Sequence, residues 1–229
     1  MKYIHNVDTY QDYIASYAEK DARPNLSLIQ DRNVVYNIND QIVNIGNGTS
    51  SSRYFPTYVY YYCSLTQQIY TPSEIGVAGN ITAIAFKVYN NKTITRKIRI
   101  YIRHTSKNAF DSSTSWDLIS NDSYYCYDGP VNFKANGWTV IPFIKPFSYN
   151  GTSNLLVCIS DYTYLGSGTS TSSALSYYCH STGANKTLYY YSSSGISTSD
   201  SNIVKLKGTL STYSNNIKLC INSAHAPNT

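Results

Sequence analysis

The sequence has little charge, almost no methionine and no long hydrophobic run. Charged residues make up 14% of its 229 positions, against a usual share of about 25%, and methionine occurs once. No window approaches the roughly eighteen consecutive apolar residues of a membrane-spanning helix. Asp8, Gln11 and Asp12 interrupt the region in which a signal peptide has its apolar stretch. The sequence therefore predicts neither a coiled coil nor a membrane protein, but a chain made and folded in a cytoplasm.

Cysteine is present in a pattern that predicts neither a disulfide framework nor a metal site. The five cysteines are odd in number and widely spaced, without a Cys-x-x-Cys pair or a histidine at ligand spacing. Cys179 and His180 are adjacent, but neighbours on a strand point to opposite faces, so a catalytic couple is not expected. We expect free, buried thiols, no metal and no cofactor. The cysteines are Cys63, Cys126, Cys158, Cys179 and Cys220.

Tyrosine and small polar residues dominate what is present. Tyrosine occurs 25 times, and this aromatic content favours pleated strands over helices. Runs of β-branched and aromatic residues, separated by turn residues, predict an all-β protein with a β-sandwich or jelly roll. The predicted strands are 58–62, 81–89, 94–102, 138–143 and 155–159. Residues 161–201 are rich in Ser, Thr, Gly and Tyr, which fits either loops or short polar strands.

The first forty residues differ from the rest in charge. Residues 1–40 hold four Lys/Arg against six Asp/Glu, a net of −2, whereas residues 41–229 hold fourteen against seven, a net of +7. Apolar residues at helical spacing predict a helix over 9–19 that ends before Pro24, and two short runs at 26–29 and 34–38 predict a hairpin. We therefore divide the chain into an N-terminal arm, residues 1–40, and a β domain, residues 53–229.

Residues 41–52 contain two glycines and a serine run, which is the composition of a linker. A helix of about a dozen residues is marginal alone in water, so the arm should dock on another protein or pack back on its own domain. The predicted contacts of the arm are Tyr10, Tyr13, Ile14, Tyr17, Leu26, Leu28, Val34 and Val35.

The β domain carries a series of motifs between residues 57 and 160. They include Gln68-Ile69-Tyr70-Thr71-Pro72, Gly79-Asn80-Ile81-Thr82 and Pro146-Phe147-Ser148-Tyr149-Asn150-Gly151. This series resembles a module of surface and secreted adhesin-type proteins of Bacteroidota. The resemblance covers a little under half of the chain and implies an adhesin-type β-sandwich without catalytic residues.

A second resemblance lies in the arm. Residues 24–37 have the sequence Pro-Asn-Leu-Ser-Leu-Ile-Gln-Asp-Arg-Asn-Val-Val-Tyr-Asn. This segment resembles the N-terminal segments of virion proteins of crAss-like bacteriophages, which infect Bacteroidota. Together the two resemblances imply a capsid-mounted head fibre or decoration protein, bound through its arm to a capsid or capsid auxiliary protein. The alternative is a Bacteroidota cell-surface adhesin whose export signal is missing from this chain.

Residue patterns for catalysis are weak, so an enzyme is not expected. Glycan hydrolysis needs two facing carboxylates, whereas Asp111, Asp117, Asp122 and Asp128 lie in a Ser/Asn/Tyr-rich stretch that is typical of solvated turns. His104 follows a strand, but no serine stands in a nucleophile elbow.

A basic stripe lies within 94–103. Strand alternation predicts that Ile98, Ile100 and Ile102 face the core, and that Lys97, Arg99, Tyr101 and Arg103 share the solvent face. The stripe is either a solvated strand that discourages edge pairing or an electropositive contact for an acidic glycan or an acidic neighbouring subunit. No nucleic-acid motif accompanies this charge, so nucleic acid is not an expected partner.

Tyrosines also cluster along the sequence, at 58–62, 124–127, 177–178 and 189–191. In a strand only alternate members can be buried, so about half of them should face outward. Outward tyrosines suit both sugar stacking and subunit contacts. We expect a homo-oligomer, with a trimer ahead of a dimer, and a host-surface glycan as the candidate ligand.

Overall fold

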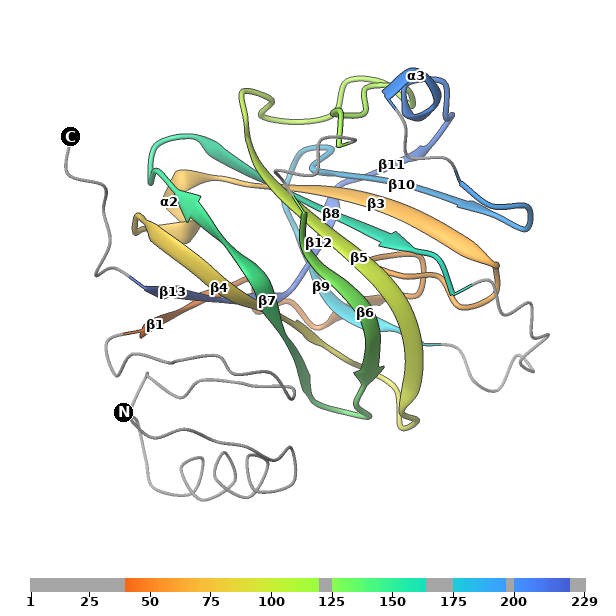
Figure 1. Cartoon of the computed structure of the whole chain (residues 1–229), viewed down its shortest axis with the longest axis horizontal. Coiled ribbons are helices and arrows are strands. Elements are labelled where there is room, and N and C mark those ends of the chain that lie inside the picture. Colours follow the sequence, from red (N-terminus) through yellow and green to blue (C-terminus); the bar gives the residue numbers. More distant parts are fainter. Residues whose placement is uncertain (1–39, 120–124, 164–174, 197–199, 223–229) are drawn as a thin grey trace.

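The computed structural model describes residues 40–119, 125–163, 175–196 and 200–222. The regular secondary structure of these residues is nearly all β-strand (Figure 1). Every strand pair is antiparallel, which confirms the all-β prediction. The helix and hairpin predicted for the arm, with all eight of their predicted contact residues, lie outside the described residues.

Two larger sheets form a β-sandwich, and a third, smaller sheet lies beside them. The four-stranded sheet has the order β1 (Asp40–Ile45), β13 (Ile217–Asn222), β4 (Gly79–Lys87), β7 (Trp138–Tyr149). The six-stranded sheet has the order β11 (Thr209–Ser211), β10 (Thr187–Ser192), β3 (Cys63–Tyr70), β8 (Asn154–Asp161), β5 (Ile94–Thr105), β6 (Tyr125–Phe133). The third sheet contains β12 (Tyr213–Asn215), β9 (Tyr177–Ser181) and β2 (Ser50–Ser52). Two short helices, α2 (Pro72–Ile75) and α3 (Asp200–Ile203), connect strands.

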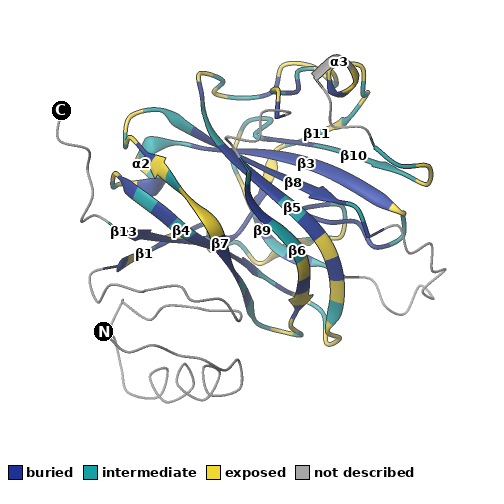
Figure 2. Cartoon of the chain, viewed as in Figure 1, coloured by how far each residue is buried: buried dark blue, intermediate teal, exposed yellow. Residues whose placement is uncertain are grey.

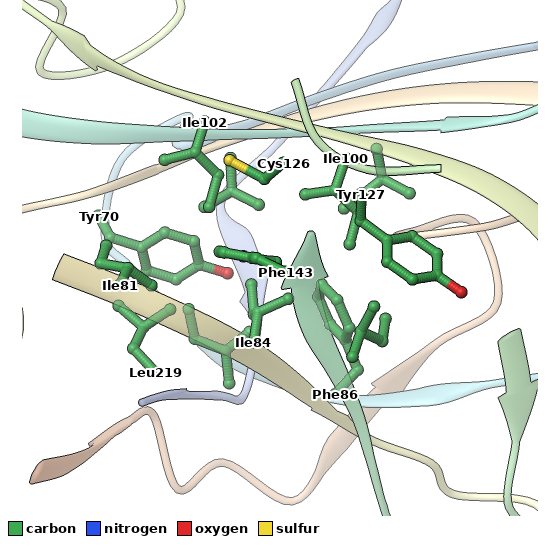
Figure 3. Packing of buried hydrophobic residues seen from close by; sticks show 14 of the residues in the cluster. Tyr70, Ile81, Ile84, Phe86, Ile100, Ile102, Cys126, Tyr127, Phe143 and Leu219 are labelled. Carbon is green, nitrogen blue, oxygen red and sulfur yellow. The ribbon is translucent and has the colours of Figure 1, made fainter. Parts of the chain in front are cut away.

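The main core lies between the two larger sheets. Ile98, Ile100 and Ile102 of β5 are fully buried in it, as their alternation predicted, and they face residues such as Ile84 and Phe143 of the opposite sheet (Figure 3). Fully burying one such side chain contributes about 1.5–3 kcal/mol. The core therefore fixes which face of each central strand points outward.

A second apolar cluster covers part of the other face of the six-stranded sheet. Tyr101 of β5 packs there with Phe110, Trp116 and Leu188, and the indole Nε1 of Trp116 donates a hydrogen bond to the Leu206 carbonyl at 2.8 Å. As a result β3 is buried on both faces along its whole length (Figure 2). The sequence predicted a solvent-facing Tyr101; this is wrong, because the segment before Trp116 folds over this end of the sheet.

The predicted linker is also wrong, because most of residues 40–52 form strands. β1 pairs along its full length with β13, and β2 pairs with β9. Between them, Gly46 has a φ of +77°, and a Cβ on Gly48 would lie 2.3 Å from the Cys179 carbonyl oxygen. These glycines permit a left-handed turn and a close approach of two backbones. Composition alone cannot distinguish glycines that permit a tight turn or a close backbone approach from glycines of a flexible linker.

One predicted strand is absent, whereas four of the five are present. Residues 58–62 form a turn, in which the Tyr61 amide donates to the Tyr58 carbonyl at 3.3 Å, and β3 begins only at Cys63. Strand propensity misled here because the tyrosine rings pack against one another instead of alternating across a sheet. The runs at 81–89, 94–102, 138–143 and 155–159 correspond to β4, β5, β7 and β8, and the open region 161–201 contains β9 and β10.

Candidate functional site

Tyrosines from two distant segments meet beside β3. Because β10 pairs antiparallel with β3, Tyr191 lies opposite Ser64 and Tyr189 opposite Thr66. This register brings both rings next to the turn that precedes β3. The Tyr191 ring centroid lies 4.8 Å from that of Tyr58, and the Tyr189 ring stacks on Tyr54 at 5.5 Å with an interplanar angle of 21°.

A groove with a volume of about 340 Å³ opens beside this stack. We call it the tyrosine-rich groove. Its wall combines aromatic rings with hydroxyl groups, because β2 contributes serines and β10 to β12 contribute Tyr189, Ser211 and Tyr213. Tyr213 remains 40% exposed. The described residues that line the groove are Ser50, Ser51, Ser52, Tyr54, Phe55, Cys179, Tyr189, Leu210, Ser211 and Tyr213.

Arg53 places a positive charge at the edge of the same aromatic stack. Its Cζ lies 5.4 Å from the Tyr54 ring centroid and 5.8 Å from that of Tyr60, and its Nη2 donates a hydrogen bond to the Tyr54 hydroxyl at 3.4 Å. That hydrogen bond raises the pKa of Arg53, and burial raises the pKa of Tyr189. The guanidinium is therefore charged and the Tyr189 phenol neutral at physiological pH.

Cys179 lines the groove but is not activated as a nucleophile. Burial raises the pKa of its thiol to about 11, so the thiolate is scarce at neutral pH. His180 does not bond to it; its Nδ1 instead lies 3.1 Å from Asn216 Oδ1, and burial lowers its pKa. All five cysteines are buried and free, as predicted.

Four carboxylates of the described residues are held in ion pairs. Asp161 accepts from Arg96 Nε at 2.7 Å inside the sandwich, and Asp128 accepts from Arg99 Nη2 at 2.7 Å nearer the surface. Asp117 pairs with Lys107 at 2.8 Å, and Glu74 with Lys186 at 3.3 Å. Paired carboxylates of this kind are structural rather than poised for acid–base work. Among the described residues, no group of three or more His, Cys, Asp or Glu is placed to hold a metal ion.

The structure does not bring the predicted basic stripe together as one solvated surface. Lys97 is exposed, but Arg99 pairs with Asp128, Tyr101 is buried, and Arg103 Nη1 donates to the Leu118 carbonyl at 2.6 Å. His104, which follows the stripe, accepts a hydrogen bond at Nε2 from the backbone N–H of Asn150. Burial lowers the pKa of His104.

The groove itself was missed by sequence reasoning. Its tyrosines belong to two of the clusters noted in the sequence, but nothing in the sequence shows that β10 pairs with β3. Its serines, Ser50 to Ser52, were interpreted as linker. No helix of the described residues is long and apolar enough to cross a bilayer.

Comparisons with known proteins add little. No family model matches the chain, and no curated protein matches it. A solved structure of the cysteine protease and lectin-like domains of Cwp84, a surface layer associated protein of Clostridium difficile, is similar at a TM-score of 0.39 and 8% identity. The match covers 71% of this chain and 33% of that chain, so the chain spans about a third of the Cwp84 structure. A likeness this distant carries no weight for function.

Proposed function

We propose that the chain is a non-enzymatic structural and binding protein of a bacteriophage virion, a capsid-mounted head fibre or decoration protein that contacts a host-surface glycan. The tyrosine-rich groove carries the binding part of this proposal. The virion setting rests on the resemblance of residues 24–37 to crAss-like phage virion proteins and of residues 57–160 to Bacteroidota adhesin modules. The alternative remains a Bacteroidota cell-surface adhesin.

The chemistry of the groove supports a glycan as its ligand. Aromatic rings provide flat apolar surface with few rotatable bonds, and their hydroxyls provide hydrogen bonds. Tyr54, Tyr189 and Tyr213 supply both, and three consecutive serine residues, Ser50 to Ser52, add further donors and acceptors. A saccharide has the matching pattern of apolar C–H faces and hydroxyl edges. The volume of about 340 Å³ falls at the lower end of ligand pockets and suits one or two sugar rings.

The ion pairs of the described carboxylates support binding rather than hydrolysis. A glycosidase places two free carboxyl groups about 5–10 Å apart across its substrate. None of the described residues that line the groove carries a carboxylate. The four paired carboxylates are also engaged elsewhere in the molecule.

The groove is tested with the full chain and capsular polysaccharide purified from a Bacteroidota host. Tyr213→Ala should weaken binding about tenfold in isothermal titration, because it removes an exposed ring from the groove. Tyr62→Ala is the matched control, since Tyr62 is 37% exposed but does not line the groove. Equal affinities for wild type and both variants would refute a groove-bound glycan.

The virion setting is tested by mass spectrometry and electron microscopy of purified particles. We expect the chain on the capsid exterior, bound through its N-terminal arm, residues 1–40, of which Asp40 also belongs to β1. Because β1 begins at Asp40, a truncation that starts at residue 40 keeps every described strand, and it should be folded but absent from particles. Incorporation of the truncated chain would refute the anchor, and absence of the full chain from particles would favour the cell-surface alternative.

The proposed self-association is tested by light scattering on the full chain. We propose a homo-oligomer, with a trimer ahead of a dimer, whose contacts include exposed tyrosine rings outside the two sugar-binding surfaces, such as Tyr62. The structure limits the number available, because Tyr58, Tyr70 and Tyr177 are buried within one chain. A monomer at tens of micromolar would refute the oligomer.

A further inference from the structure

Two lysines and three aromatic rings gather on the outer face of the four-stranded sheet. In this sheet β13, β4 and β7 lie side by side (Figure 1). Phe86 of β4 and Ile217 of β13 point into the main core. Since side chains alternate along a strand, Lys87 and Lys218 lie on the opposite, outer face.

The register explains how the two lysines meet the rings. Lys218 is paired with Ala85, and Lys87 is paired with Trp138. The small side chain of Ala85 leaves room for Lys218 to cross β4, and its Nζ lies 4.6 Å from the Trp138 ring centroid. Lys87 reaches in the other direction, and its Nζ lies 4.7 Å from the ring centroid of Tyr178 in β9.

A third ring borders this group. Tyr89 follows β4, is 50% exposed, and meets the Tyr178 ring edge-on at 5.3 Å and 80°. Its position is fixed by a hydrogen bond from its amide to the Ser176 carbonyl at 2.9 Å. On β1, the exposed Asn44 stands opposite Lys218 and adds an amide to the same face. We call Lys87, Lys218, Trp138, Tyr178 and Tyr89 together the lysine–aromatic site.

The charge of this site is not balanced within the described residues. Four ion pairs occur among them, and neither Lys87 nor Lys218 belongs to one. The pKa of Lys218 is lowered by burial and by repulsion from Lys87. Two ammonium groups that repel each other on a partly desolvated surface are stabilised by an anion placed between them.

We infer that the lysine–aromatic site binds the carboxylate or sulfate group of an acidic saccharide. The inference rests on the proposed glycan-binding function and adds the charge of the glycan to it. Both ammonium groups contact the anion, while the exposed face of Tyr89 packs on sugar C–H groups and the Asn44 amide bonds to a hydroxyl. The rings distinguish the site from a purely electrostatic patch, which an acidic protein surface would suit equally well.

The lysine–aromatic site is separate from the tyrosine-rich groove. The two approach each other at β9 and β2, where Cys179 lines the groove, Tyr178 belongs to the lysine–aromatic site, and the groove residue Ser51 pairs with Tyr178. Adjacent residues of a strand point to opposite faces, so the Cys179 and Tyr178 side chains leave β9 on opposite sides. A glycan chain could use one site without the other, and variants at one should not alter the other.

The test compares oligogalacturonate and dextran sulfate with uncharged dextran of the same length, using the full chain in isothermal titration. We expect both acidic probes to bind more tightly than dextran. Lys87→Met with Lys218→Met should weaken their binding at least tenfold. Lys97→Met removes an exposed lysine from the other sheet and should leave binding unchanged. The groove test uses a different variant and a different polysaccharide, so the two results are independent of each other.

NMR provides a second readout that does not depend on affinity. Saturating oligogalacturonate should raise the pKa of Lys218, measured from its ε-carbon shift, because the bound anion opposes the repulsion from Lys87. If Lys97→Met lost as much affinity for the acidic probes as the double variant, the effect would be one of overall charge, and the proposed site would be refuted. An unchanged Lys218 pKa would also overturn it, and polyglutamate binding equal to that of oligogalacturonate would overturn the assignment to saccharides.

Discussion

The two sheets of the sandwich treat their basic residues differently. On β5 of the six-stranded sheet, Arg96 and Arg99 each pair with a carboxylate of a neighbouring strand, and Arg103 donates to a backbone carbonyl. On the four-stranded sheet, Lys87 and Lys218 contact aromatic rings and have no ion-pair partner among the described residues. The arginines of β5 are thus held by internal partners, whereas Lys87 and Lys218 of the other sheet keep an unbalanced charge among the described residues.

This difference shows why a run of basic residues is a poor guide to a binding surface. The sequence 94–103 is the most basic stretch of the β domain, yet its arginines are held by the fold. Lys87 and Lys218 are 131 positions apart in sequence, and only the β13–β4 pairing brings them together. What matters for an external anion is the charge that remains after internal pairing.

The largest expected effect breaks the internally paired side. Asp161→Asn leaves the Arg96 guanidinium buried without its carboxylate, since the two side chains are 0% and 4% exposed. We expect a loss of about 3–5 kcal/mol in unfolding free energy, measured by chemical denaturation. Adding Arg96→Met should recover most of that loss, because the unpaired buried charge is then gone. A single-variant loss below about 1 kcal/mol would contradict a buried, structural ion pair.

Sequence periodicity captured the part of this architecture that depends on burial. The alternation of Ile98, Ile100 and Ile102 located the core face of β5 because burial imposes a period of two on a strand. Pairings between distant strands could not be predicted, since antiparallel strands of similar composition admit many orders. The lysine–aromatic site and the groove both depend on such pairings, β13 with β4 and β10 with β3.

A second kind of error came from residues with more than one structural use. Gly46 and Gly48 were interpreted as linker glycines, whereas the structure uses them to pass close to β9. Alternation predicted that Tyr101 faces solvent, but the segment that follows β5, with Phe110 and Trp116, covers its face. Propensity and period describe a strand and its own neighbours, and they contain no information about what packs over it.

A smaller effect is expected at the partly exposed pair of β5. Arg99→Gln removes the ion pair with Asp128, but the Arg99 side chain is 40% exposed, so solvent screens much of the interaction. Tyr162 also keeps its hydrogen bond to Asp128 in this variant. We expect a loss of no more than about 1 kcal/mol by the same denaturation assay. A loss as large as that of Asp161→Asn would show that exposure does not separate the two pairs.

The same pair predicts a pH dependence. Burial raises the pKa of Asp128, but hydrogen bonds from Tyr162 and Arg99 outweigh it, so the pKa lies below the usual 3.8. A carboxylate whose pKa is lower in the folded state contributes stability above its unfolded pKa and loses that contribution as the pH falls through the folded value. The stability difference between wild type and Asp128→Asn should therefore be constant from pH 7 to about pH 4 and shrink below it. A difference that already disappears at pH 6 would contradict this assignment.

The smallest effect has the opposite sign and lies on the other sheet. Lys218→Met keeps an unbranched side chain that can still pack on Trp138, and it removes a half-buried charge that Lys87 repels. The lost cation–π contact opposes this gain by about 0.5–1 kcal/mol. We expect a net change between zero and about 0.5 kcal/mol of stabilisation, within the usual range of surface substitutions.

The repulsion itself is measured by combining the variant with Lys87→Met: the double variant should gain less than the sum of the single gains, because either substitution alone removes the repulsion. Added salt should stabilise the wild type more than Lys218→Met, since it screens the remaining repulsion. Strict additivity together with equal salt responses would mean that the two ammonium groups do not interact, and the contrast between the two sheets would then reduce to the ion pairs of β5.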